Sequence, residues 1–366
     1  MRILVINTVE YVISGISTVI MNYFEKIDHE AFQCDFVING YVENRYLEIM
    51  KRYNANIYYL ERKGKTMQYI VDIFKIIHRY RYDIIHVHGN SCTMAIELFA
   101  GKVAKCQIRI AHGHNTACVH KRMHELLRPL FERTCTDRIA CSEEAGKWLF
   151  RGKKFDILEN AIDLSKYQFD RLKAESIRNQ LKIKEDEIVL GHIGIFNKQK
   201  NQSFVLKVFH ALYQEDQKYK LLFIGQGEME SMVKKEAEEL QLQENIIFYG
   251  VTDDVPEILS AMDIFIFPSL HEGLGIAAVE AQLMGLPCVM SDQVPDEAVI
   301  SPNCRKLSLN KPLEEWCDVV ASYTAYIGER NNHGLTMSKI KRFDIDRQVI
   351  KLEEMYRQQS RNTHKE

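Results

Sequence analysis

Short apolar segments rich in Ile, Val and Phe alternate along the chain with longer segments whose apolar residues recur at helical spacing. In the first half, the segments that we predict to be strands are 2–8, 34–39, 56–60, 83–88, 109–112, 138–142 and 155–160. Several are apolar on both faces, as strands buried in a parallel sheet are. Amphipathic stretches lie between them, such as Thr66–Arg79 with Ile70, Ile73, Phe74 and Ile77. This alternation predicts a parallel sheet with helices on both faces.

The same pattern restarts after a polar segment at 165–187. The strands predicted in the second half are 187–195, 220–225, 245–250, 263–269 and 287–291. We therefore predict an α/β protein with two doubly wound, Rossmann-like domains at 1–165 and 166–343. Residues 344–366 form a C-terminal helical segment that could pack back on the first domain. Because such sheets bind ligands beyond the carboxyl ends of their strands, we expect the two domains to face a cleft.

Composition agrees with two ordinary globular domains. The chain has 366 residues, of which 46% are hydrophobic and 27% charged, and this excludes disordered and collagen-like proteins. No apolar stretch approaches the length of a membrane span, and the N-terminal MRILVINTVEY reads as a strand, not a signal peptide. Nine scattered cysteines without a C-x-x-C pair favour a reducing compartment, so we expect a cytoplasmic location.

The net charge of −2 carries no nucleic-acid signature, but the charge is unevenly distributed. Residues 121–154 contain nine basic and five acidic side chains. This stretch is either a solvated face or a patch that contacts anionic lipid or a phosphorylated partner, for instance peripherally at the inner face of a membrane.

The most informative segment is Phe267–Gly285, which reads FPSLHEGLGIAAVEAQLMG. A strand precedes a loop that contains Glu272 and Gly273, and a helix begins near Gly275 and contains Glu280. The glycines let backbone amides approach a ligand closely, and the positive end of the helix suits a phosphate or diphosphate. The two carboxylates can then face the two ends of that ligand.

The same letters also fit G-x-G-x-x-A, a dinucleotide fingerprint made by Gly273, Gly275 and Ala278, with Asp292 after the next strand. A loop separates the strand from the first glycine, however, and the motif stands late in its domain. Both features disfavour a nicotinamide or flavin enzyme.

Two H-x-H pairs stand at predicted strand ends, His86 with His88 and His112 with His114. Residues i and i+2 of a strand share a face, so the pairs could bind zinc, supply one catalytic contact or simply bond to backbone. No cysteine or carboxylate completes an evident ligand set, and we expect no metal. Asn160 is interpreted as a loop cap in preference to a ligand contact.

The pattern E272-x7-E280, preceded by PS and followed by A-x-x-x-G-x-P, resembles the signature of the retaining GT-B glycosyltransferases of glycosyltransferase family 4. Further segments appear in that family's order, among them DIIHVHG (83–89), RIAHGHN (109–115), GHIGIFNKQKN (191–201) and FIGQGEM (223–229). The resemblance extends over nearly the whole chain and is strongest to enzymes of bacterial capsule and exopolysaccharide assembly. It implies a GT-B fold with an acceptor-binding first domain and a nucleotide-sugar-binding second domain.

The resemblance also implies residue roles. Glu272 lies beside the donor sugar, Lys200 neutralises the leaving diphosphate, and His114 lies near the reacting sugar. Glu280 binds the ribose; the less favoured alternatives are that Glu280 is an ordinary surface residue of a helix and that Lys200 is solvated. The implied donor-binding residues are Glu280, Gly273, Leu274, Gly275, Lys198, Gly250, Val251, Thr252 and Gly15.

Two positions depart from the family pattern. Ile195 stands where the family usually has an arginine on the diphosphate, and Lys198 is the candidate substitute. The first loop is ISGIS (13–17), so Ser14 replaces one glycine of the usual pair before Gly15.

The resemblance implies transfer of a hexose or N-acetylhexosamine, with retention, from a nucleotide sugar that we expect to be UDP-linked. The acceptor would be a glycan or a lipid-diphosphate-linked glycan of surface polysaccharide, and no cofactor or obligatory metal is implied. Ile195 leaves open a non-catalytic relative that binds sugar nucleotide or glycan.

Overall fold

The computed structural model describes residues 1–328, 330, 335 and 337–363. The chain divides into two compact units, one formed by Met1–Asp163 with the C-terminal segment from Lys341, and the other by Leu164–Ile340. The boundaries predicted from the sequence, 165 and 343, lie within three residues of these.

The first unit is built on a seven-stranded sheet in the order β3-β2-β1-β4-β5-β6-β7, and all neighbouring strands are parallel. The strands are β1 (Arg2–Asn7), β2 (Gln33–Asn39), β3 (Ile57–Leu60), β4 (Ile84–Gly89), β5 (Ile108–Gly113), β6 (Asp137–Ala140) and β7 (Asp156–Ile157). Each of the seven predicted apolar segments of the first half is therefore a strand. The order reverses between β1 and β4, so the loops that follow these two strands flank the switch point of the sheet.

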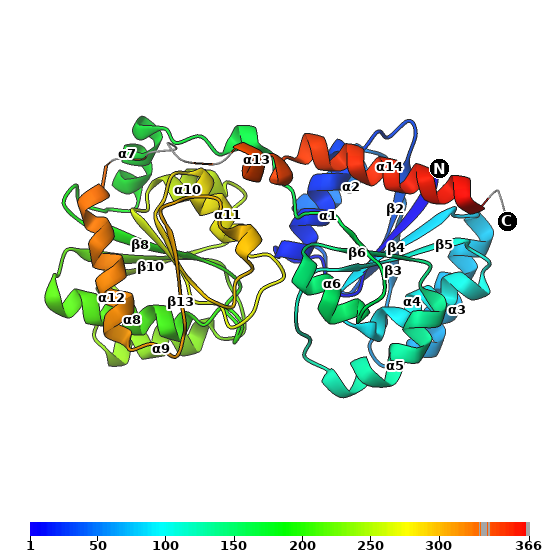
Figure 1. Ribbon diagram of the computed structural model, residues 1–366, viewed down its shortest axis with the longest axis horizontal. Coiled ribbons are helices and arrows are strands. Elements are labelled where there is room, and N and C mark those ends of the chain that lie inside the picture. Colours follow the sequence, from blue (N-terminus) through cyan, green and yellow to red (C-terminus); the bar gives the residue numbers. More distant parts are fainter. Residues whose placement is uncertain (329, 331–334, 336, 364–366) are drawn as a thin grey trace. The chain divides into compact units, whose positions relative to one another are not determined.

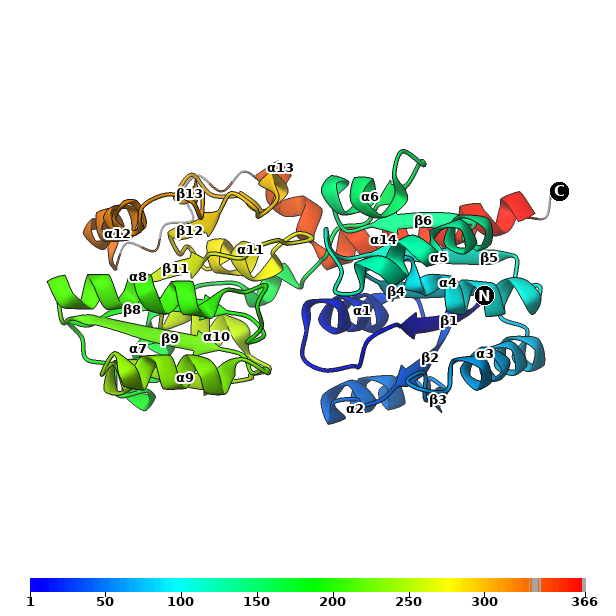
Figure 2. The same ribbon diagram turned by 90° about the horizontal axis from the view of Figure 1, so that it is seen from below.

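Helices cover both faces of this sheet (Figures 1 and 2). They are α1 (Gly15–Lys26), α2 (Asn44–Arg52), α3 (Thr66–Tyr80), α4 (Ala95–Val103), α5 (Lys121–Thr134), α6 (Glu143–Phe150) and α14 (Ile345–Thr363). Apolar side chains of α1, α2 and α14 share one buried core with the strands. The predicted amphipathic helix at 66–79 is α3, which buries Tyr69, Ile73 and Ile77.

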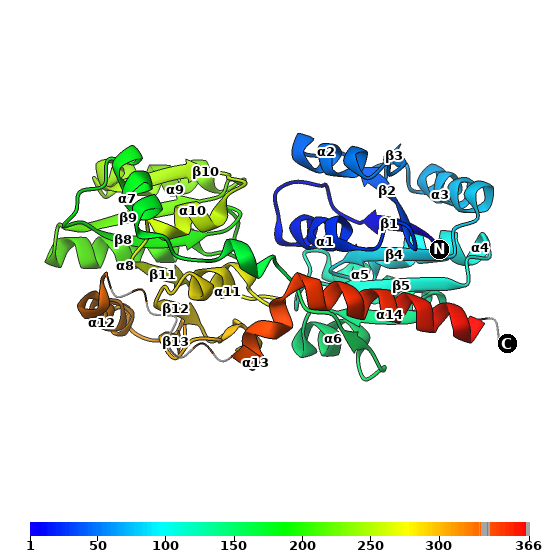
Figure 3. The ribbon, with the colours of Figure 1, turned by 90° about the horizontal axis from the view of Figure 1, so that it is seen from above.

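The C-terminal helix α14 is part of the first unit and lies beside α1 (Figure 3). Ile345, Val349, Leu352 and Tyr356 enter the same core as β1 and β2. These positions recur at helical spacing, so one apolar stripe of α14 is buried against the sheet and α1.

The second unit contains a six-stranded parallel sheet in the order β10-β9-β8-β11-β12-β13. Its strands are β8 (Ile188–Ile193), β9 (Tyr219–Ile224), β10 (Ile246–Gly250), β11 (Ile264–Phe267), β12 (Cys288–Ser291) and β13 (Cys304–Leu307). The sequence pattern predicted the first five but missed β13. That strand stands at the sheet edge and carries Arg305 and Lys306, as edge strands often do.

The helices of the second unit are α7 (Arg171–Gln180), α8 (Gln202–Glu215), α9 (Glu230–Glu239), α10 (Val255–Ser260), α11 (Ile276–Leu283), α12 (Leu313–Ser322) and α13 (Met337–Ile340). Side chains of α8, α9 and α12 form one core with the strands, and Figures 1 and 2 show α8 and α9 on the same face of the sheet. The strand order reverses between β8 and β11. The loops after these two strands therefore flank the switch point where doubly wound sheets bind ligands.

All nine cysteines are free thiols. Among the described residues, none of the helices combines the length and the apolar character that crossing a bilayer requires.

Candidate active site

The switch point of the second unit brings two loops together, residues 194–201 after β8 and 268–275 after β11. Hydrogen bonds join them: the amide of Leu270 donates to the carbonyl of Gln199 over 2.8 Å, and Asn201 Nδ2 donates to the carbonyl of Pro268 over 3.1 Å. Residues distant in sequence thus form one rigid frame.

An ion pair lies within this frame. Lys200 Nζ donates to Glu272 Oε1 over 2.6 Å, and the side chains are only 17% and 7% exposed. The ammonium group also lies 4.5 Å from the centroid of the Phe267 ring, a favourable cation–π position. The interpretation of Lys200 as a solvated lysine is therefore wrong.

Gly194 makes room for the lysine. A Cβ at this position would lie 2.8 Å from Lys200 Cγ and 2.9 Å from its Cδ, so the methylene stem crosses the face that the glycine leaves open. The backbone amide of Lys200 donates to Asn197 Oδ1 over 3.1 Å and fixes the loop that carries the stem.

Helix α11 begins directly after this ion pair. Gly275 precedes its first residue and has a φ of +86°, in the left-handed region that favours glycine. The first amides of a helix have no acceptor within it and carry the positive end of the helix dipole. The backbone of Leu274 and Gly275 leads into this turn, and the Leu274 side chain is buried, which anchors it.

The substitution Gly275→Ala tests this turn. The new Cβ would lie 3.1 Å from Val294 Cγ1 and 3.3 Å from Phe267 Cε1, in addition to the cost of about 1–2 kcal/mol for a left-handed alanine. We expect a lower Tm and weaker phosphate binding. The matched control is Gly250→Ala, whose φ is +83° but whose Cβ would have nothing within 4 Å. Equal losses of Tm in the two variants would contradict the packing argument.

Glu280 is buried in the second turn of α11, where the Tyr167 hydroxyl donates to its Oε1. Burial raises the pKa of Glu280 from its ordinary value of 4.5 to about 7, although Tyr167 and the positive charge of Lys200 act in the opposite direction. The interpretation of Glu280 as an ordinary surface residue of the helix is therefore wrong. The carboxyl group changes its charge near neutral pH.

The other residues predicted to bind the donor lie outside the ion pair. Gly250 ends β10, and Val251 and Thr252 follow it as partly exposed loop residues. Lys198 is exposed and, within the described part of the chain, belongs to no ion pair, so it is not brought to Glu272 as Lys200 is. The carbonyl of Ile195 accepts from Gln202 Nε2 over 3.0 Å. The apolar side chain of Ile195 carries no charge with which to replace an arginine.

In the first unit, the four histidines of the two H-x-H pairs form one buried cluster. His88 stands opposite His112 in the register of β4 and β5, and His114 follows the end of β5. His114 Nε2 lies 2.9 Å from His88 Nδ1. Burial lowers the pKa of His114 to about 4, while the neighbouring amide of Asn160 acts in the opposite direction, so the imidazole is neutral at pH 7.

Gly15 is the first residue of α1, after the switch-point strand β1, and it is exposed. A Cβ there would have nothing within 4 Å, so packing does not demand glycine. Ser14 caps the helix, because its side chain accepts from the amide of Ser17 over 3.4 Å. The serine that departs from the double-glycine pattern therefore has a structural role.

Three contacts of the candidate site were missed from the sequence. They are the hydrogen bond of Tyr167 to Glu280, the Phe267 ring beside Lys200, and the Tyr356 hydroxyl that reaches the histidine cluster from α14. A strand-end phenylalanine beside the motif was a usable signal for the second. The other two contacts involve Tyr167 and Tyr356, which stand in segments with no motif.

Comparisons with known proteins agree with this fold and with the position of the two switch-point loops. Residues 173–306 match the family model described as "Glycosyl transferases group 1". The two parallel sheets and similar solved structures show a two-domain GT-B fold. The chain is similar to GT-B glycosyltransferases of the type found in capsule and exopolysaccharide synthesis.

Three similar proteins illustrate this. EpsF of Bacillus subtilis (strain 168), which is provisionally named a glycosyltransferase, is 27% identical over 85% of both chains. The UDP-Gal:alpha-D-GlcNAc-diphosphoundecaprenol alpha-1,3-galactosyltransferase of Escherichia coli is 24% identical over 94% of both. The crystal structure of Anabaena Alr3699/HepE in complex with UDP and glucose has a TM-score of 0.81 at 15% identity, and covers 96% of this chain and 98% of its own.

Proposed function

We propose that the protein is a retaining glycosyltransferase of family 4 that moves a hexose or N-acetylhexosamine from a UDP-linked donor. The observation that carries this proposal is the Lys200–Glu272 ion pair at the opening of α11, with Glu280 buried in the same helix. The loop after β8 and the segment that opens α11 can thus offer a cation, helix amides and two carboxylates to a single ligand.

The chemistry follows from where charge develops. Breaking a sugar–diphosphate bond places negative charge on the phosphate oxygens and positive charge on the anomeric carbon. Lys200 and the amides that open α11 stabilise the first, and Glu272 holds the sugar and faces the second. Because these groups supply the positive charge, we propose that the transfer needs no divalent metal.

Glu280 and the loop after β10 complete the donor side of the proposal. The carboxylate of Glu280 accepts hydrogen bonds from the ribose, in place of the Tyr167 hydroxyl that it binds in the free protein. Gly250, Val251 and Thr252 line the base. His114, held neutral by burial, can donate or accept a hydrogen bond at the reacting sugar.

Two relatives support the choice of donor and acceptor. The Anabaena protein binds UDP and glucose, and the Escherichia coli galactosyltransferase is named for a UDP-linked donor and a diphosphoundecaprenol-linked acceptor. We propose the same kinds of molecule here, a UDP-sugar and a glycan on a lipid diphosphate.

An exposed apolar stripe on a basic helix agrees with a lipid-linked acceptor. On α5, Met123 and Leu126 are 45% and 71% exposed, beside the exposed cations Lys121 and Arg122. We propose that this face makes peripheral contact with anionic lipid, because basic residues attract the headgroups while apolar side chains enter the interface.

Leu126→Glu tests that contact. We expect a several-fold loss of binding to phosphatidylglycerol vesicles in a sedimentation assay, because the change removes an apolar anchor and adds a repelled charge. Leu172→Glu is the control, since Leu172 is 78% exposed on α7 of the second unit. Equal binding of both variants and the wild type would contradict the proposal.

The experiment that tests the function is UDP release. The purified protein is incubated with a panel of UDP-sugars and lipid-diphosphate glycan acceptors, and UDP is measured. We expect release that depends on both substrates, and a product with the anomeric configuration of the donor. Tight UDP-sugar binding without release on any acceptor would favour the non-catalytic relative that Ile195 suggests.

A further inference from the structure

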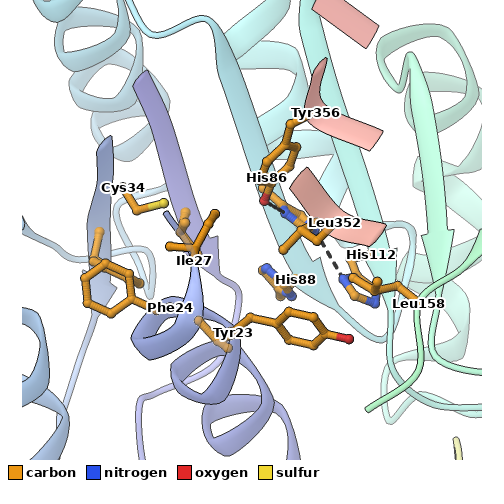
Figure 4. Close-up of a pocket in the computed structure, with 13 residues that line it drawn as sticks. Tyr23, Phe24, Ile27, Cys34, His86, His88, His112, Leu158, Leu352 and Tyr356 are labelled. Atoms are coloured by element: carbon orange, nitrogen blue, oxygen red, sulfur yellow. Dashed lines mark hydrogen bonds between the residues drawn. The ribbon is translucent and has the colours of Figure 1, made fainter. Parts of the chain in front are cut away.

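The histidine cluster of the first unit contains a geometry that the proposed transfer does not use. His86, His88 and His112 each offer one ring nitrogen, and these nitrogens lie within 4.8 Å of one another. All three side chains are buried, and they arise from two adjacent strands whose pleat points them to one face. Figure 4 shows the three rings gathered below Tyr356.

The hydrogen bonds of the cluster leave the right nitrogens available. His86 Nδ1 lies 2.7 Å from the Tyr356 hydroxyl, and His88 Nδ1 lies 2.9 Å from His114 Nε2. When these Nδ1 atoms carry the protons, the Nε2 atoms of both rings present lone pairs. A histidine that binds a metal donates its other N–H to a neighbouring group in the same way.

The spacing also suits a single ion. His86 Nε2 and His112 Nδ1 are 3.2 Å apart, and two ligands at about 2.0–2.1 Å from a tetrahedral Zn²⁺ stand about 3.3 Å apart. Binding would replace one hydrogen bond between the rings by two coordinate bonds.

Room for a further ligand lies beside the rings. A cavity of about 30 Å³ is lined by His86, His88 and His112 together with Tyr23 and apolar side chains (Figure 4). A single water needs about 10–15 Å³, so the cavity has room for one. Such a water can lose its proton to the solvent on binding Zn²⁺, which offsets part of the charge that three neutral ligands leave.

We propose that His86, His88 and His112 form a structural binding site for a borderline first-row divalent ion such as Zn²⁺. A water in the cavity is the fourth ligand. Tyr356 and His114 hold two of the ligand rings in place. Because Tyr356 belongs to α14, an ion here ties the C-terminal helix to β4 and β5. The site lies in the first unit and is independent of the donor-binding residues of the second.

The test uses the full chain and Zn²⁺ alone. Metal-free protein is either titrated directly or refolded with Zn²⁺, dialysed, and analysed for metal content and Tm. We expect about one ion per chain and a rise in Tm, and tetrahedral visible bands when Co²⁺ replaces Zn²⁺. His112→Gln and His88→Gln should reduce the metal content at least tenfold, while His78→Gln, an exposed control on α3, should not.

Tyr356→Phe keeps the three ligands and serves if the histidine variants fail to fold. It should weaken Zn²⁺ binding by about 10- to 100-fold. The proposal is overturned if the wild type retains less than a tenth of an ion after both protocols. It is also overturned if His78→Gln reduces the metal content as much as the cluster variants, or if Tyr356→Phe leaves affinity unchanged.

Discussion

Replacing Lys200 by alanine is expected to lower the rate of sugar transfer by about 100- to 1,000-fold, the usual effect of removing one preorganised charge donor from a developing anion. The ammonium group is held by Glu272, by the Phe267 ring and by the open face of Gly194, so it needs no reorganisation when the diphosphate departs. Because Ile195 supplies no second cation at its position, Lys200 alone provides the side-chain charge, and removing it should have a large effect on the rate. The measurement is the rate of UDP release at saturating donor.

Two further variants make this result specific. Lys198→Ala removes an exposed charge two residues before Lys200 and should leave the rate within a few-fold of wild type. Glu272→Gln keeps the shape of the ion pair and should lower turnover more than it lowers UDP affinity, since the carboxylate acts on the sugar. Comparable losses in Lys198→Ala and Lys200→Ala, with native circular dichroism in both, would contradict the assignment.

Glu280→Gln is expected to weaken UDP binding by about 10- to 100-fold, because a hydrogen bond to a charged acceptor contributes about 1.5–3 kcal/mol. In the wild type, affinity should depend on pH through this residue. The pKa of Glu280 is about 7, so only about a tenth of the carboxyl groups are ionised at pH 6. The affinity for a UDP-sugar, whose diphosphate does not titrate in this range, should therefore rise between pH 6 and 8 in the wild type, and calorimetry should find it flat over this range in Glu280→Gln.

Titration of Glu280 should also make the free energy of unfolding depend on pH, and here the value should fall as the pH rises. The unfolded carboxyl group ionises near 4.5, whereas the folded one keeps its proton until about pH 7. The unfolded chain therefore binds fewer protons in this window, and the free energy of unfolding falls as the pH rises from 4.5 to 7, by up to about 3 kcal/mol. Glu280→Gln should lack this fall. Parallel pH profiles of unfolding for the two proteins would contradict the burial argument.

The sheets were predictable because parallel strands buried on both faces leave long apolar runs. Twelve strands were predicted from apolar runs, and most of them are buried on both faces, whereas β13 was missed because its exposed edge permits Arg305 and Lys306. The packing of α14 on the first core was offered as a possibility, but the sequence did not require it. The stripe of Ile345, Val349 and Leu352 on α14 indicates a buried face but does not say which unit covers it.

Some residues of the candidate site could be predicted from the sequence, and others could not. Glu272, Gly275 and Glu280 belong to one short segment, so spacing alone predicts that they meet. Lys200 is 72 residues from Glu272, and only the resemblance to a family linked the two before the fold did. Tyr167 has no such signal, because its contact with Glu280 depends on where the chain returns after leaving the first unit.

The histidines show why residue type and spacing were insufficient. Each H-x-H pair indicates a shared face, but the register that sets His88 opposite His112 is a property of the assembled sheet. From the sequence, zinc binding, a catalytic contact and hydrogen bonding to the backbone were therefore all possible roles. The sequence did not show which of the four rings lie next to each other.

The most direct test of the account is a crystal structure with UDP bound. The account predicts the diphosphate at the amides of Leu274 and Gly275, Lys200 Nζ within hydrogen-bond distance of a phosphate oxygen, and the ribose on Glu280 with the Tyr167 hydroxyl displaced. A nucleotide bound with its phosphates away from the start of α11 would contradict it.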